Sequence, residues 1–168
     1  MGKVIYVIWL ILAIGFIFFS IDDLIWDFAY FVTFRRRQKD IYKLDFDVLY
    51  SVPPKLLAVI IAAWHEDNVL EKVVDHFIAT THYPQSMYHI FLGVYPNDPA
   101  TIDVARRLEK KYENVHVVIN RMDGPTSKAQ NLNNVLSNIR QFEQSHNWRF
   151  SSVTIHDSED VVHPYELR

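Results

Sequence analysis

The most constraining feature of the sequence is an uncharged apolar segment near its amino terminus. Residues 4–21 are rich in Ile, Leu, Phe and Trp, and as a helix they would extend about 27 Å, close to the thickness of a bilayer's hydrocarbon core. A secretory signal peptide is the alternative. The segment is longer than a typical signal core, however, and no small-x-small cleavage motif follows it. We therefore predict that residues 1–34 form a transmembrane helix with an interfacial continuation.

The residues that follow this segment indicate its orientation. Aromatic and acidic side chains mix over residues 24–34, a composition typical of the membrane–water interface. Five basic residues come next, whereas Lys3 alone precedes the segment: Arg35, Arg36, Arg37, Lys39 and Lys43. The positive-inside rule then predicts that the basic flank and all residues after it face the cytoplasm. Residues 35–55 are predicted to be a basic juxtamembrane linker that meets anionic lipid rather than nucleic acid.

Composition narrows the possible functions of the whole chain. It has 168 residues, and its 17 basic and 20 acidic residues give a net charge of -3, so no global positive field favours nucleic acid. The absence of cysteine excludes disulfides, cysteine-based zinc sites and cysteine nucleophiles. Residues 56–168 are enough for one folded domain that begins after Pro53 and Pro54.

That domain alternates between two hydrophobic patterns. Short apolar runs of the kind found in buried parallel strands alternate with segments whose apolar residues recur at helical spacing. The predicted strands cover residues 56–63, 88–95, 115–119 and 152–156, and the predicted helices cover 69–78, 99–112 and 128–142. Asp67 and Asn68 are candidate caps for the first of these helices, and Asp98 before Pro99 for the second. The pattern predicts an α/β domain with a Rossmann-like parallel sheet and flanking helices.

Polar residues gather where each predicted strand ends. In open parallel sheets this edge binds ligands. Each polar residue taken alone has a simpler explanation as a helix cap, a surface lysine or a solvated turn, but all four strand ends carry them. The residues concerned are Trp64 to Asp67, Pro96 to Asp98, Arg121 to Lys128 and His156 to Asp160.

The acidic cluster at the last strand is the strongest single signal. Asp157, Glu159 and Asp160 lie within four residues, and carboxylates so close repel one another unless a cation such as Mg2+ or Mn2+ binds them. Lys128 follows Gly124 and Ser127 at the start of a predicted helix, where an anion could bind. Neither a P-loop nor a GxGxxG motif is present. These residues together predict a divalent cation that holds a phosphate-bearing ligand.

Three stretches carry a family resemblance: YPNDP at 95–99, GPTSKAQNLNN at 124–134 and HDSEDVVHPYELR at 156–168. With them, residues 57–168 resemble the nucleotide-binding half of family 2 inverting glycosyltransferases of the GT-A fold, and most closely a membrane-anchored group of phage-adsorption proteins. The resemblance implies that Glu66 and Asp98 contact the base and ribose of a nucleotide-sugar, with a UDP-sugar the favoured donor, and that Lys128 lies near the nucleotide. It further implies that Asp157 and Glu159 bind the diphosphate through Mg2+ or Mn2+, with Asp160 as an additional ligand.

The sequence also departs from the family pattern. In the first motif, Ala62 stands where proline is usual and His65 where asparagine is usual. The acceptor half, with its catalytic aspartate and [QR]xxRW motif, does not follow. We therefore expect an N-terminal part of an enzyme that binds donor and metal without turnover. The alternative is an inactive membrane-tethered module that binds an envelope or phage partner; a receiver-type signalling domain fits poorly, because the acidic residues follow the fourth strand instead of the first.

Overall fold

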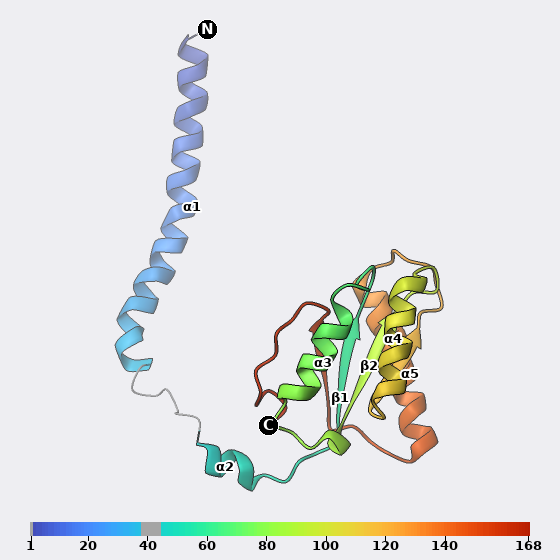
Figure 1. Ribbon diagram of the computed structural model, residues 1–168. Helices are drawn as coiled ribbons and strands as arrows, with labels where there is room; N and C mark the ends of the chain where they lie inside the picture. The colour runs from blue at the N-terminus through green and yellow to red at the C-terminus, as the bar shows by residue number, and fades with distance from the viewer. Residues whose placement is uncertain (1, 38–44) are drawn as a thin grey trace. The chain divides into compact units, whose positions relative to one another are not determined.

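The computed structural model describes residues 2–37 and 45–168, and its chain divides into two compact units, residues 1–45 and 46–168 (Figure 1). Lys39 and Lys43 of the predicted basic linker lie outside the described residues. Residues 2–37 of the first unit form one continuous helix, α1 (Gly2–Arg37). Residues Gly2–Phe34 of this helix are long and apolar enough to cross a membrane. The predicted span and its interfacial continuation therefore form a single helix.

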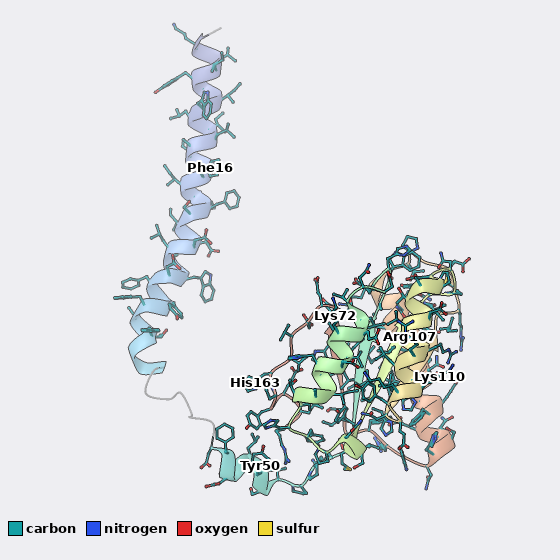
Figure 2. The ribbon with its side chains drawn as sticks, viewed as in Figure 1. Phe16, Tyr50, Lys72, Arg107, Lys110 and His163 are labelled. Atoms are coloured by element: carbon teal, nitrogen blue, oxygen red, sulfur yellow. The ribbon has the colours of Figure 1, made fainter. Side chains whose placement is uncertain are left out.

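The side chains of α1 project away from the helix on all sides, as Phe16 does in Figure 2. The apolar residues of Gly2–Phe34 are exposed all round, and none is buried within the structure. A helix that is apolar on every face needs an apolar environment on every face, and in a membrane lipid supplies it. The helix thus has the length and surface of a membrane span.

The second unit is built on a four-stranded parallel sheet in the order β3-β2-β1-β4. Its strands are β1 (Leu57–Ala62), β2 (Tyr88–Val94), β3 (Val115–Ile119) and β4 (Ser152–Asp157). The connecting helices are α3 (Leu70–Thr80), α4 (Pro99–Lys111) and α5 (Lys128–His146), preceded by the short α2 (Phe46–Ser51) and with a 3-10 turn at Gln85–Met87. The α/β class with a parallel sheet and flanking helices is confirmed.

Helices cover both faces of the sheet, which explains why the central strands are apolar throughout. Side chains alternate along β1, so that Val59 and Ile61 pack with α3 and α4 while Ala58 and Ile60 pack with α5. Figure 1 shows α3 and α4 on one side of the sheet and α5 on the other. Edge strand β4 is less protected, and its Ile155 is 49% exposed. The layers fix the carboxyl ends of all four strands at one edge.

Side chains cap two of the three helices, and Asp98 does so as predicted. The side chain of Asp98 accepts a hydrogen bond from Thr101 N at the start of α4, and that of Ser127 accepts one from Gln130 N at the start of α5. The prediction of Asp67 or Asn68 as the cap of α3 is wrong. The cap position is Val69, which makes no side-chain cap bond. The carbonyl of Glu66 accepts from the N–H groups of both Val69 and Leu70 and forms the turn that begins the helix.

The second unit begins at Phe46 because α2 packs against the last residues of the chain. The ring of Tyr165 lies 5.0 Å from that of Phe46 and 4.8 Å from that of His82, measured between centroids. The His82 N–H donates to the Pro164 carbonyl at 2.7 Å, and Leu167 is buried in the core shared with α3. Residues 163–168 therefore join α2 to the sheet.

Candidate functional site

A cavity of about 380 Å³ opens at the carboxyl edge of the sheet. It is lined by residues at or after the ends of β1, β2, β3 and β4 and by residues of the first turn of α5. The register explains this convergence, because Ala62 at the end of β1 pairs with both Gly93 and Asp157. The lining residues are Ala62, Ala63, Trp64, Glu66, Tyr95, Pro125, Thr126, Lys128, Asn131, Asp157, Ser158 and Glu159. The predicted ligand-binding edge thus contains a cavity with both acidic and basic side chains.

The acidic cluster forms a tight turn at the end of β4, and its three carboxylates have different surroundings. Asp160 turns back, and its Oδ2 accepts a hydrogen bond from the Asp157 N–H at 2.8 Å. The Asp160 N–H in turn donates to the Asp157 carbonyl at 3.2 Å. Asp157 and Glu159 line the cavity, whereas Asp160 does not. Two carboxylates therefore face the ligand space, and the third stabilises the turn that presents them.

Lys128 and Asp157 form an ion pair across the cavity, between Nζ and Oδ1. Lys128 is the first residue of α5, so the helix that begins with Ser127 as its cap positions this cation. Both side chains are about half exposed, and such a pair contributes little to stability. Its importance is local, because it places a positive and a negative group side by side at the helix amino terminus.

Glu66 and Asp98 do not play the same part in the structure. Glu66 lines the cavity, whereas Asp98 is only 2% exposed and does not. Asp98 Oδ2 accepts from the His65 N–H at 2.7 Å, and its Oδ1 accepts from the Thr101 N–H at 3.3 Å. Burial alone would raise the pKa of Asp98, but the hydrogen bonds from Thr101 and His65 outweigh it and lower that pKa. Asp98 thus holds the loop after β1 in place from beneath the site.

Sequence reasoning did not assign roles to the aromatic part of the cavity wall. The rings of Trp64 and Tyr95 meet nearly edge to face, 4.9 Å apart. Gly124 lies against Trp64 so closely that a Cβ at this position would be 2.4 Å from Cζ3 of the indole. Only glycine fits there without displacing the ring. Trp64 was visible in the sequence as a large residue directly after a strand, but its contact with the loop after β3 was not.

Asn131 is the other lining residue that sequence reasoning missed. Its Nδ2 donates to the Gly93 carbonyl at 3.1 Å, and its Oδ1 is buried with no hydrogen-bond partner among the described residues. A buried acceptor without a partner is costly unless a ligand or water supplies a donor. Asn131 lies one turn into α5, in the GPTSKAQNLNN stretch. The motif therefore included this residue, but the sequence did not indicate that its side chain lines the cavity. The site therefore has an unused acceptor beside its charged groups.

His65 adopts a strained backbone conformation within the site. Its φ of 58° lies in the left-handed region, which asparagine and glycine adopt more readily than other residues. We expect His65→Asn to stabilise the protein by up to about 1 kcal/mol, because the left-handed penalty falls while the backbone bond to Asp98 remains. Thermal unfolding of the full chain in detergent, followed by circular dichroism, measures this. His76→Asn makes the same change on an exposed helical residue and should be nearly neutral; a loss of stability in His65→Asn would contradict the strain argument.

Comparisons with known proteins identify the family of the chain. The sequence profile described as "Glycosyltransferase like family 2" matches residues 53–168. The chain is 39% identical over 166 residues to bacteriophage adsorption protein B of Escherichia coli K12, and equally to bacteriophage N4 adsorption protein B of E. coli O157:H7. Each alignment covers 96% of this chain and 22% of the relative, so the chain spans about a fifth of their length. The chain therefore belongs to glycosyltransferase-like family 2.

Proposed function

We propose that the cavity binds a nucleoside diphosphate sugar together with Mg2+ or Mn2+, and that the chain is the donor-binding part of a membrane-bound inverting glycosyltransferase. The observation that carries the proposal is the grouping of Asp157, Glu159 and Lys128 around one cavity at the carboxyl edge of the sheet. Family membership supports the donor class. A UDP-sugar is the donor that we favour.

The chemistry of the lining fits a divalent cation. Asp157 and Glu159 supply the carboxylate oxygens that Mg2+ and Mn2+ prefer. The described residues contain no group of three or more acidic or histidine side chains arranged as a complete metal site. A cation that binds with a diphosphate needs only one or two protein carboxylates, because phosphate oxygens and water complete its coordination. Asp157 and Glu159 would hold the cation, which when bound supplies positive charge to a leaving diphosphate.

The remaining lining residues suit the rest of the donor. The amino group of Lys128 can pair with a phosphate, and the free Oδ1 of Asn131 can accept a hydrogen bond from a hydroxyl of the donor. Trp64 offers an aromatic edge and face beside Glu66 for the base. Asp98 acts indirectly, because it fixes the backbone of the loop that carries both. The charged side chains that line the cavity are taken up by the donor and its cation, so we expect the 168-residue chain to bind donor without transferring sugar.

The membrane part of the proposal rests on α1. Its apolar stretch would anchor the chain in a bacterial inner membrane, and the basic residues after it would keep residues 46–168 in the cytoplasm. Nucleotide-sugars are water-soluble, so a cytoplasmic cavity would have access to them.

Binding of the donor tests this proposal directly. We expect the full chain in detergent micelles to bind UDP-glucose or UDP-N-acetylglucosamine in isothermal titration calorimetry when Mn2+ is present, and about tenfold or more weaker in EDTA. Circular dichroism of the same sample would confirm that it is folded. Folded protein that gives no heat with millimolar UDP-sugar and Mn2+ would contradict the proposal.

A binding module without catalysis is the second candidate function. The relatives are named bacteriophage adsorption proteins, and the exposed side of edge strand β4, with Val153 and Ile155, could accept a protein partner. In this case the cavity would be dispensable. A variant with a disabled cavity that keeps the phenotype of the chain would favour this second candidate.

A further inference from the structure

We infer that the outward side of α2 rests in the lipid–water interface of an anionic membrane. The side chains concerned are Phe46, Tyr50 and Val52, which we call the α2 patch, and they are 46%, 47% and 54% exposed. Tyr50 is labelled on α2 in Figure 2. The inference rests on the membrane anchor proposed for α1 but not on donor binding.

The α2 patch is held rigidly on the second unit. The ring of Tyr165 lies 5.0 Å from the ring of Phe46 and 6.2 Å from that of Tyr50. The guanidinium of Arg168 lies 4.4 Å from the centroid of the Tyr50 ring. These contacts attach Phe46 and Tyr50 to the end of the second unit, and each ring nevertheless keeps nearly half of its surface exposed. Clustered, exposed aromatic and aliphatic residues of this kind mark interaction surfaces.

The chemistry of the α2 patch suits the headgroup level of a bilayer. Tyrosine combines an apolar ring with a polar hydroxyl, which is why it is enriched at membrane interfaces. A cavity of about 340 Å³ lies beside α2, and the two cations in its lining, Lys55 and Arg168, outnumber its one acidic residue, Glu166. Leu49 and Val52 also line it. Cations next to apolar side chains match anionic headgroups above acyl chains. Asp47, in the first turn, complements the helix amino terminus.

The distance along the chain favours lipid over another protein as the occupant. Beyond the apolar core ending at Ile21, the rest of α1 would rise about 24 Å at 1.5 Å per residue if it stood upright. The connection from Arg37 to Phe46 can extend about 30 Å, so the α2 patch can return to the headgroups. A surface tethered this closely meets lipid at a high effective concentration. The basic residues of the intervening sequence, at 35, 36, 37, 39 and 43, favour an anionic membrane as the partner of this part of the chain.

Site-directed spin labelling tests the inference on the full chain, which has no native cysteine. Single nitroxide labels at Val52→Cys, Val161→Cys and Ile14→Cys would be compared in nanodiscs of phosphatidylglycerol and phosphatidylcholine. Val161 is 82% exposed beside the acidic turn and serves as the aqueous control, and Ile14 in mid-α1 reports insertion. The measurement is the accessibility ratio of oxygen, which enters lipid, to a nickel chelate, which does not.

We expect the oxygen-to-nickel ratio at residue 52 to exceed that at residue 161 by about threefold or more when phosphatidylglycerol is present, and by less in phosphatidylcholine alone. Equal ratios at the two sites, with residue 14 in lipid, would overturn the inference while leaving the anchor intact. Protection of residue 52 from both reagents with spin–spin broadening would assign the α2 patch to a second copy of the chain instead. An aqueous signal at residue 14 would overturn the anchor and the inference together. Neither result would affect the proposal of donor binding.

Discussion

Asp157→Asn is expected to weaken binding of UDP-sugar with Mn2+ by at least about tenfold, or 1.4 kcal/mol. The substitution keeps the size and shape of the side chain but removes the negative charge that attracts a cation. It also removes the ion pair with Lys128. Because both side chains are about half exposed, the melting temperature should change little. Calorimetric titration of the full chain in detergent measures the affinity, and circular dichroism measures the melting temperature.

Asp123→Asn is the matched control for this experiment. Asp123 belongs to the loop after β3 and is exposed, but it does not line the cavity. The same chemical change there should leave the affinity within about twofold of the original protein. Equal affinities for Asp157→Asn and the unchanged chain would contradict the assignment of the acidic turn to the donor site. A phenotype in cells that survives Asp157→Asn despite lost binding would favour the second candidate function.

Acidification from pH 7 to pH 4.5 is expected to cost about 2 to 3 kcal/mol of stability through one buried histidine. His89 and His116 face each other across β2 and β3, with Nδ1 and Nε2 2.8 Å apart. Burial, then the proximity of His116 and His146, lowers the pKa of His89 to about 4. Burial and His146 also lower the pKa of His116, although Glu109 opposes them. Both rings are therefore neutral in the folded protein at pH 7.

The sign follows from proton binding in the two states. An unfolded histidine binds a proton near pH 6.5, whereas folded His89 does so only near pH 4. Its stabilising contribution is thus complete above pH 6.5 and is lost as the pH falls from 6.5 to 4. Asp75 and Asp98, whose pKa values are lowered, lose their contribution only below about pH 3.8. The pH range in which the histidines lose their stabilising contribution is separate from that of the two aspartates. The loss of stability between pH 6.5 and 4 is therefore assigned to the histidines.

Thermal unfolding of the full chain at several pH values tests this expectation. His89→Gln keeps a hydrogen-bonding group opposite His116 but cannot titrate, so the fall in melting temperature between pH 6.5 and 4.5 should become much smaller. His76→Gln removes an exposed histidine from α3 and should leave the fall unchanged. An equally steep fall in His89→Gln would place the acid sensitivity elsewhere.

Much of the fold could be predicted because its signals are local. Strand β3 was predicted at Val115–Ile119, where the structure has it, and the ends of the other three strands were predicted to within one residue. Asp98 and Pro99 specified the start of α4, because a side-chain acceptor and a fixed φ suffice there without tertiary contacts. The face of α5 followed from its helical spacing, since Val135 and Ile139 are fully buried.

What escaped prediction depends on contacts between distant residues. The six residues of α2 are too few for a periodic pattern, and the helix is held by Tyr165, more than a hundred positions later. At the start of α3 the hydrogen-bond acceptor is the backbone carbonyl of Glu66. Every residue has such a carbonyl, so the sequence does not indicate which one is used. The acidic turn was predicted as a unit. That Asp157 lines the cavity while Asp160 stabilises the turn depends on a hydrogen bond between them that only the structure shows. The role of Asn131 needed the position of Gly93 on a neighbouring strand.

The sheet separates the α2 patch from the donor cavity. Leu57, the first residue of β1, lines the cavity beside α2, and Ala62, the last, lines the donor cavity. The six residues of β1 make the strand roughly 20 Å long. With the α2 patch in the headgroups, the proposed sugar nucleotide would reach the cavity from the aqueous side without meeting the bilayer. If β1 ran along the membrane normal, an acceptor at the headgroups would be about one strand length from the cavity.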